Sequence, residues 1–149
     1  MPISEPTAVF SIRDDRDMEI KQAVLAQVDE FAGDRVIYAS STSGLLISEI
    51  AKLSQYPERC IGAHPYNPPH LIPLVEVVKS DASSDEVAQT VMEVLSSVGK
   101  EPVLCKKDVP GFIANRMQHA LWREAISIVE NGIADAATVD EAGRYSFGL

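Results

Sequence analysis

The 149-residue chain is short of positive charge and of long apolar runs. Thirteen Lys and Arg residues stand against 22 Asp and Glu residues, a formal net charge of −9. This balance argues against nucleic acid or an anionic membrane surface as a main partner. The apolar runs are far shorter than a membrane span, and the first residues lack the charged and apolar regions of a secretory signal. We therefore expect a soluble intracellular protein, which we place in the cytoplasm.

The chain also has only two cysteines, Cys60 and Cys105. They lie far apart on predicted strands, where buried free cysteines behave as small apolar residues, so we expect no disulfide. The three histidines, His64, His70 and His119, have no spacing to the cysteines that is typical of a zinc site. We therefore predict no metal site.

Short apolar segments alternate with amphipathic segments over the first two thirds of the chain. The apolar segments predict strands at residues 8–12, 36–39, 60–64, 74–78 and 102–105. Helices are predicted at residues 18–31, 45–53 and 85–98. Strands that alternate with helices predict an α/β fold with a parallel sheet.

Asp108-Val109-Pro110-Gly111 is the best candidate for a domain boundary, because proline and glycine interrupt the periodicity there. A long helix is predicted after it, from Phe112 to about Asn131, with Gly132 as its stop. Apolar residues recur along this helix at helical spacing, and we interpret them as core: Ile113, Met117, Leu121, Ala125 and Ile128. The chain therefore divides into residues 1–108 and residues 109–149.

The most informative residue for function is His64, which ends a predicted buried strand and is followed twelve positions later by Glu76 on the next strand. Histidine exchanges protons near neutral pH, and a buried carboxylate can fix its tautomer and stabilise the imidazolium. The spacing therefore indicates an acid–base pair acting on a hydroxyl. The alternative is structural: His64 could bond a backbone carbonyl at the end of its strand while Glu76 faces solvent.

Four segments resemble the 3-hydroxyacyl-CoA dehydrogenase family, in the branch that includes L-gulonate 3-dehydrogenase, lambda-crystallin and carnitine dehydrogenase. They stand in the family's order and spacing: Ala39-Ser40-Ser41-Thr42-Ser43-Gly44-Leu45, the stretch from His64 to Glu76, Gly99-Lys100-Glu101-Pro102-Val103, and Val109-Pro110-Gly111-Phe112-Ile113-Ala114-Asn115-Arg116. The resemblance implies that residues 1–108 are the C-terminal part of a Rossmann-like NAD-binding domain. It also implies that residues 109–149 are the first helices of the family's C-terminal domain.

The resemblance further implies hydride transfer between NAD and the carbon of a secondary alcohol, in a small-molecule hydroxy acid or an acyl-CoA. His64 and Glu76 would be the catalytic pair, and Ser43 would lie near both substrate and nicotinamide. Asn67 would lie on the cofactor side, and Asn115 would help to bind the reacting oxygen. Each has a simpler alternative: Ser43 could belong to a cluster that caps the next helix, and Asn115 could face water.

A Gly-rich turn of the form G-x-G-x-x-G, which holds the pyrophosphate of NAD in this family, occurs nowhere in the chain. We therefore expect the adenosine half of the NAD site to be absent and the chain to be an internal piece of a dehydrogenase. The strand at residues 8–12 would then lie at an unpaired edge, which favours self-association or a homo-oligomer.

Three functions remain open at this point. The chain could be the catalytic half of a dehydrogenase, active in a longer or completed form. It could also be a non-catalytic protein used for binding or structure, or a truncated fragment without a stable fold.

Overall fold

The computed structural model describes residues 8–12 by their backbone and residues 17–148 in full. It divides into two compact units, Met1–Phe112 and Ile113–Leu149. The first contains a five-stranded sheet in the order β1-β2-β3-β4-β5, formed by β1 (Ala8–Ile12), β2 (Val36–Ser40), β3 (Cys60–Pro65), β4 (Leu74–Val78) and β5 (Glu101–Cys105). This agrees with the expected α/β class, and the five predicted strands are present to within one residue at each end.

One strand pair differs from the parallel sheet that we expected. β1–β2, β2–β3 and β4–β5 pair in parallel, whereas β3 and β4 pair antiparallel. The reason is the short link from Pro65 to Leu74, because a parallel pair needs a crossover of a dozen or more residues. The sheet therefore reverses direction between the two strands that carry His64 and Glu76.

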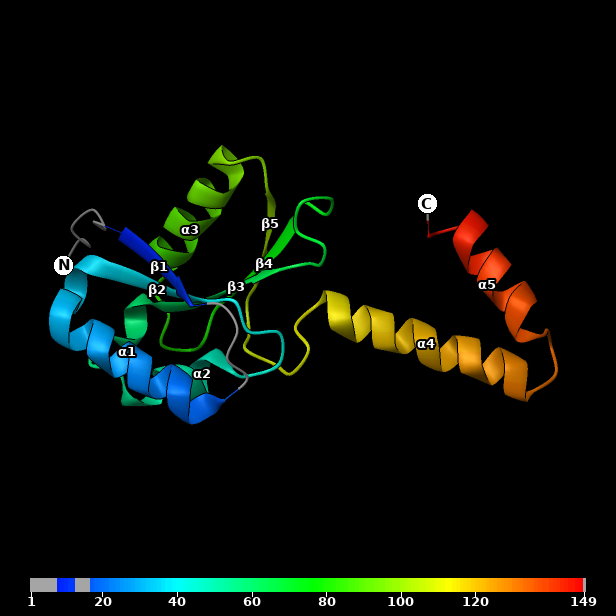
Figure 1. The fold of residues 1–149 in the computed structure, drawn as a ribbon, viewed down its shortest axis with the longest axis horizontal. Helices are drawn as coiled ribbons and strands as arrows, with labels where there is room; N and C mark the ends of the chain where they lie inside the picture. Colours follow the sequence, from blue (N-terminus) through cyan, green and yellow to red (C-terminus); the bar gives the residue numbers. More distant parts are fainter. Residues whose placement is uncertain (1–7, 13–16, 149) are drawn as a thin grey trace. The chain divides into compact units, whose positions relative to one another are not determined.

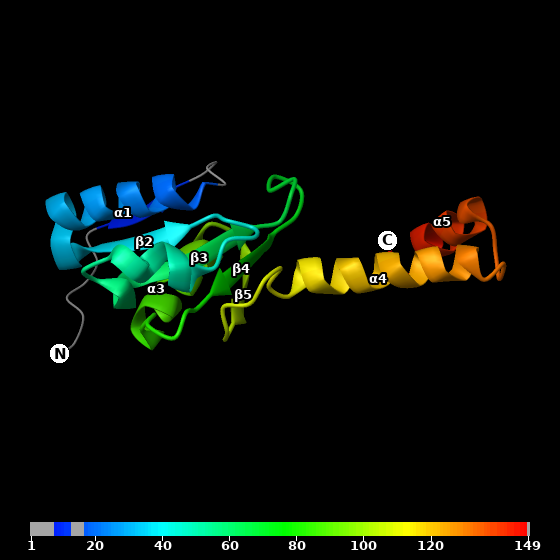
Figure 2. The same ribbon diagram turned by 90° about the horizontal axis from the view of Figure 1, so that it is seen from below.

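Helices cover both faces of this sheet (Figures 1 and 2). One apolar cluster joins Leu25 of α1 (Met18–Ala32) and Ile50 of α2 (Ile47–Ile50) to strand residues such as Tyr38. The other cluster, on the opposite face of the sheet, joins Val87 of α3 (Asp85–Ser97) to Ile37 and to other strand residues that point to that face. Neighbouring residues of a strand point to opposite faces, so Tyr38 and Ile37 serve different clusters.

The predicted helix over residues 45–53 is shorter than expected. α2 spans Ile47–Ile50 and continues as a 3-10 turn, Ala51–Leu53. Thr42 does not cap it: its Oγ1 accepts hydrogen bonds from the backbone N–H groups of Gly44 and Leu45 and closes a turn before the helix. The cap comes instead from Asp108, whose Oδ2 accepts from the Ser48 backbone N–H at 2.7 Å.

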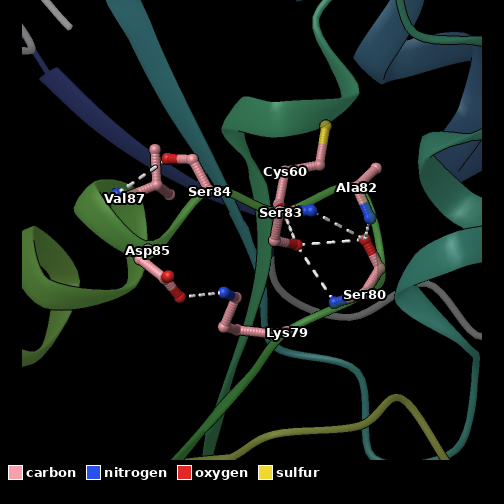
Figure 3. A network of polar contacts seen from close by, with 8 residues as sticks. All are labelled: Cys60, Lys79, Ser80, Ala82, Ser83, Ser84, Asp85 and Val87. Atoms are coloured by element: carbon pink, nitrogen blue, oxygen red, sulfur yellow. Dashed lines mark hydrogen bonds and ion pairs between the residues drawn. The ribbon is translucent and has the colours of Figure 1, made fainter. Parts of the chain in front are cut away.

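A serine-rich turn links β4 to α3, as Figure 3 shows. The Ser83 hydroxyl donates to the Cys60 carbonyl at 2.6 Å and lies 3.0 Å from the Ser80 hydroxyl, while the Ser84 hydroxyl caps α3 by accepting from the Val87 N–H. Lys79 pairs with Asp85 at the start of the helix. These polar groups bond one another, and we interpret the cluster as structural.

The second unit consists of α4 (Ala114–Glu130) and α5 (Ala136–Tyr145). α4 begins two residues later than predicted, because Phe112 has a left-handed backbone with φ 46° and cannot belong to the helix. The expected core stripe is not buried here: neither helix contains a buried residue, and Met117 is 63% exposed. No helix among residues 17–148 has both the length and the apolar content for crossing a membrane.

Candidate active site

The β3–β4 hairpin places His64 directly opposite Glu76 in the antiparallel register. The last β2–β3 partners are Ser40 and Gly62, so His64 lies two residues beyond the point where β2 stops pairing. The hairpin link is held by a hydrogen bond from the Tyr66 N–H to the Leu74 carbonyl at 3.1 Å. His64 therefore stands where the parallel part of the sheet ends, the usual position of a ligand site in an open α/β sheet.

The side chains of the two residues meet. His64 Nδ1 lies 2.8 Å from Glu76 Oε2, and the exposed fractions of the two residues are 7% and 0%. The structural alternative, in which Glu76 faces solvent, is excluded by this burial. With Nδ1 held by the carboxylate, the tautomer carries its proton on Nδ1 and leaves Nε2 as the nitrogen that can exchange a proton with a hydroxyl.

Two aromatic rings flank the imidazole of His64. The Phe112 ring is tilted by 60° with its centroid 5.7 Å away, and the Tyr66 ring is nearly perpendicular at 6.3 Å. Sequence reasoning did not single out either ring. The Pro110-Gly111 turn before Phe112 was the available signal, but it predicted a domain boundary rather than a contact with His64.

Ser43 and Asn67 lie in the segments that follow β2 and β3. Because β2 and β3 are parallel neighbours, both segments begin at the carboxyl ends of these strands, where His64 is also found. Both residues are exposed, and the peptide bond between Asn67 and Pro68 is cis. The hydroxyl of Ser43 and the amide of Asn67 offer donors and acceptors to a ligand at these strand ends.

A cleft of about 330 Å³ opens near these strand ends, on the face of the sheet that α3 covers. Its lining is mainly apolar and includes Ala39, Ala63 and Val75, with Ser41 and Lys100 as its polar members. Lys100 Nζ donates to the Pro69 carbonyl in the hairpin link. The cleft thus adjoins the segment that carries Asn67.

Asn115 is the second residue of α4 and is half-buried. It belongs to the second unit, whereas His64 belongs to the first. Its role stays a prediction from the family.

The buried Tyr38 hydroxyl and Cys60 thiol are poorly suited to proton transfer at neutral pH. Burial raises the pKa of the Tyr38 hydroxyl and that of the Cys60 thiol to about 12 each. Cys60 and Cys105 are both free and buried. Within the described part of the chain, no three His, Cys, Asp or Glu side chains gather as a metal site would require.

Sequence comparison relates the two parts of the chain to two parts of one family. Residues 15–109 match the profile of the 3-hydroxyacyl-CoA dehydrogenase NAD binding domain, and residues 111–149 match that of the 3-hydroxyacyl-CoA dehydrogenase C-terminal domain. The L-carnitine dehydrogenase of Pseudomonas syringae is 42% identical over 132 residues, which are 89% of this chain and 42% of that protein. The 5-formyl-3-hydroxy-2-methylpyridine 4-carboxylate 5-dehydrogenase of Mesorhizobium japonicum is 39% identical over 89% of this chain and 43% of its own length.

Solved structures give the same relationship. A 5-formyl-3-hydroxy-2-methylpyridine 4-carboxylic acid 5-dehydrogenase superposes with a TM-score of 0.84 and 36% identity, over 94% of this chain and 45% of that one. The (S)-3-hydroxybutyryl-CoA dehydrogenase of Ralstonia eutropha superposes with a TM-score of 0.85 and 28% identity, over 95% of this chain and 50% of that one. The chain thus spans about two fifths of the length of the curated relatives it matches, and half or less of these structures.

Proposed function

This chain belongs to the 3-hydroxyacyl-CoA dehydrogenase family, and we propose that it supplies the acid–base part of an NAD-dependent dehydrogenase acting on a secondary alcohol. The observation that supports the proposal most is the buried contact between His64 Nδ1 and Glu76 Oε2 at 2.8 Å. Family membership alone would not assign a reaction, because one fold serves many functions. The pair adds the group that a dehydrogenase needs in order to move a hydroxyl proton.

In the direction of alcohol oxidation, His64 accepts the hydroxyl proton at Nε2 while Nδ1–H stays bonded to Glu76. The imidazolium so formed is buried, and the negative charge of Glu76 stabilises it in place of water. In the direction of carbonyl reduction, the same nitrogen returns the proton to the oxygen. NAD, when bound, supplies the hydride acceptor or donor for the carbinol carbon.

The residues present fit the nicotinamide end of NAD. Ser43 and Asn67 are exposed just beyond the carboxyl ends of β2 and β3, where His64 also lies. They offer the hydroxyl and amide groups that suit a carboxamide. We assign Ser43 to both substrate and cofactor, Asn67 to the cofactor and Asn115 to the substrate oxygen. For the pyrophosphate, the sequence has no G-x-G-x-x-G turn.

For the substrate we propose a small 3-hydroxy acid or its acyl-CoA thioester. L-carnitine dehydrogenases are among the most similar curated relatives, and a 3-hydroxybutyryl-CoA dehydrogenase is among the most similar structures. A second candidate is a non-catalytic binding or structural role, because one fold serves many functions. We also propose that the chain associates with itself through the sheet edge formed by β1.

The test is a fluorescence titration of the chain with NADH, together with dehydrogenase assays on L-carnitine, L-gulonate and 3-hydroxybutyryl-CoA. Binding with turnover would support the enzyme. His64→Ala should then lower turnover by about 10² to 10⁴. His70→Ala, which removes an exposed histidine from the hairpin link, is the matched control and should leave turnover unchanged. A folded chain that binds no NADH would instead mean that this polypeptide keeps the catalytic residues of a dehydrogenase without being one by itself.

A further inference from the structure

Phe112 adopts a backbone conformation that bulky residues rarely adopt. Its φ is 46°, in the left-handed region, directly after Gly111 with φ 77°. Glycine adopts this conformation readily, but for a residue with a Cβ it is unfavourable. The surrounding structure must therefore hold Phe112 in place.

Hydrogen bonds at both ends hold the segment from Asp108 to Phe112. The Phe112 N–H donates to the Val109 carbonyl at 3.1 Å and closes a turn with Pro110 and Gly111 at its centre, the sequence that a type II turn favours. One residue before the turn, Asp108 Oδ2 accepts from the Ser48 N–H at 2.7 Å and from the Ser48 hydroxyl at 2.9 Å. The turn is thus fixed against the N-terminus of α2.

The outcome of this arrangement is the position of the Phe112 ring. The side chain is 2% exposed, belongs to the apolar cluster of α1 and α2, and lies against the imidazole of His64. Glu76 holds one atom of the imidazole, Nδ1, which still permits the ring to tilt about that bond. The Phe112 ring lies beside the imidazole, tilted by 60° with its centroid 5.7 Å away, and so restricts tilting toward that side.

We propose that Phe112 is a positioning residue, whose ring holds the imidazole of His64 in the orientation at which Nδ1 meets Glu76 and Nε2 faces the substrate. The inference rests on the proposed function, because it assigns Phe112 a part in the same proton transfer. Phe112 acts through His64 and not on the substrate. Its loss should therefore lower kcat, by roughly tenfold, and leave KM nearly unchanged.

The first readout needs no turnover. In NMR spectra of the full chain, the Nδ1–H proton of His64 is assigned by its loss in His64→Ala, and its exchange with water is measured. Phe112→Ala and Phe112→Leu should speed this exchange, by about tenfold for the alanine variant. Ile50→Ala, from the same apolar cluster and fully buried, is the control for lost packing and should leave the exchange near the wild-type rate.

Equal exchange in Phe112→Leu and the wild-type chain would overturn the proposal, and so would equal acceleration in Ile50→Ala. Phe112→Leu keeps most of the apolar bulk, so it decides the matter if the alanine variant fails to fold. Failure of the proposed function looks different: His64→Ala would then leave turnover unchanged, whatever the proton exchange shows.

Discussion

Replacing Glu76 by glutamine tests the proposed pair with the smallest change of shape. Glutamine keeps the volume and an oxygen that can accept from His64 Nδ1, but it removes the negative charge. The charge matters because Glu76 is fully buried and His64 nearly so, and water therefore contributes little to stabilising an imidazolium there. We expect Glu76→Gln to lower kcat with little effect on substrate binding.

The magnitude follows from the geometry. Nδ1 and Oε2 are 2.8 Å apart, and charge centres about 4 Å apart attract by about 4 kcal/mol at an effective dielectric constant near 20. The remaining hydrogen bond to the amide offsets part of this loss. An expected loss of about 2 to 4 kcal/mol corresponds to a decrease in kcat of roughly 30- to 1,000-fold. A glutamine that presents its NH2 group to Nδ1 would favour the wrong tautomer and place the loss near the upper end.

The assay is steady-state turnover of the hydroxy acid or acyl-CoA that proves to be the substrate, with thermal unfolding measured on each variant. Glu101→Gln makes the same chemical change at an exposed position of β5 and serves as the matched control. If the two residues act as one unit, His64→Ala combined with Glu76→Gln should be no slower than His64→Ala alone. Glu76→Gln turnover equal to that of Glu101→Gln would refute the reasoning.

Two further predictions concern the packing around the site. Gly62→Ala should destabilise the chain by about 1 to 3 kcal/mol, because the added Cβ would lie 2.9 Å from Val78 Cβ and 3.1 Å from Ile47 Cδ1; an unchanged midpoint of urea unfolding would contradict this. Cys60 and Cys105 should react slowly with a thiol reagent at pH 8 and rapidly after unfolding, because burial raises the pKa of both thiols, that of Cys60 to about 12, and only the thiolate reacts. Their reaction rates should rise with pH, and a rapid reaction of the folded chain at pH 8 would count against the buried positions.

The sequence was informative where the relevant interactions are local. Alternating apolar and amphipathic segments predicted the five strands and the α/β class, because each strand's pattern reflects its own burial. Periodicity carries no information on strand direction, so the antiparallel pairing of β3 with β4 was missed. The length of the link from Pro65 to Leu74 was the feature that could have predicted it.

Interactions between distant residues were not predictable in this way. Asp108 caps α2 from sixty residues away, and no local pattern connects it to Ser48. Phe112 follows Pro110-Gly111 and was predicted to begin a helix. In the structure it has a left-handed backbone and packs against His64 instead. The apolar stripe of α4 was predicted from its period, but a period does not identify what covers the stripe.

The separation of the pair along the chain bears on what its presence means for function. His64 and Glu76 are twelve residues apart on one hairpin, so their contact depends mainly on local pairing. The contact of Phe112 with the imidazole depends on residues farther apart in the chain, because the turn that carries Phe112 is fixed on α2. Cofactor binding requires still more, including a pyrophosphate site for which the sequence offers no Gly-rich turn. A chain could therefore lose the ability to bind NAD while its acid–base pair stayed intact. For this reason NADH binding, and not the geometry of the pair, distinguishes a working dehydrogenase from a non-catalytic relative.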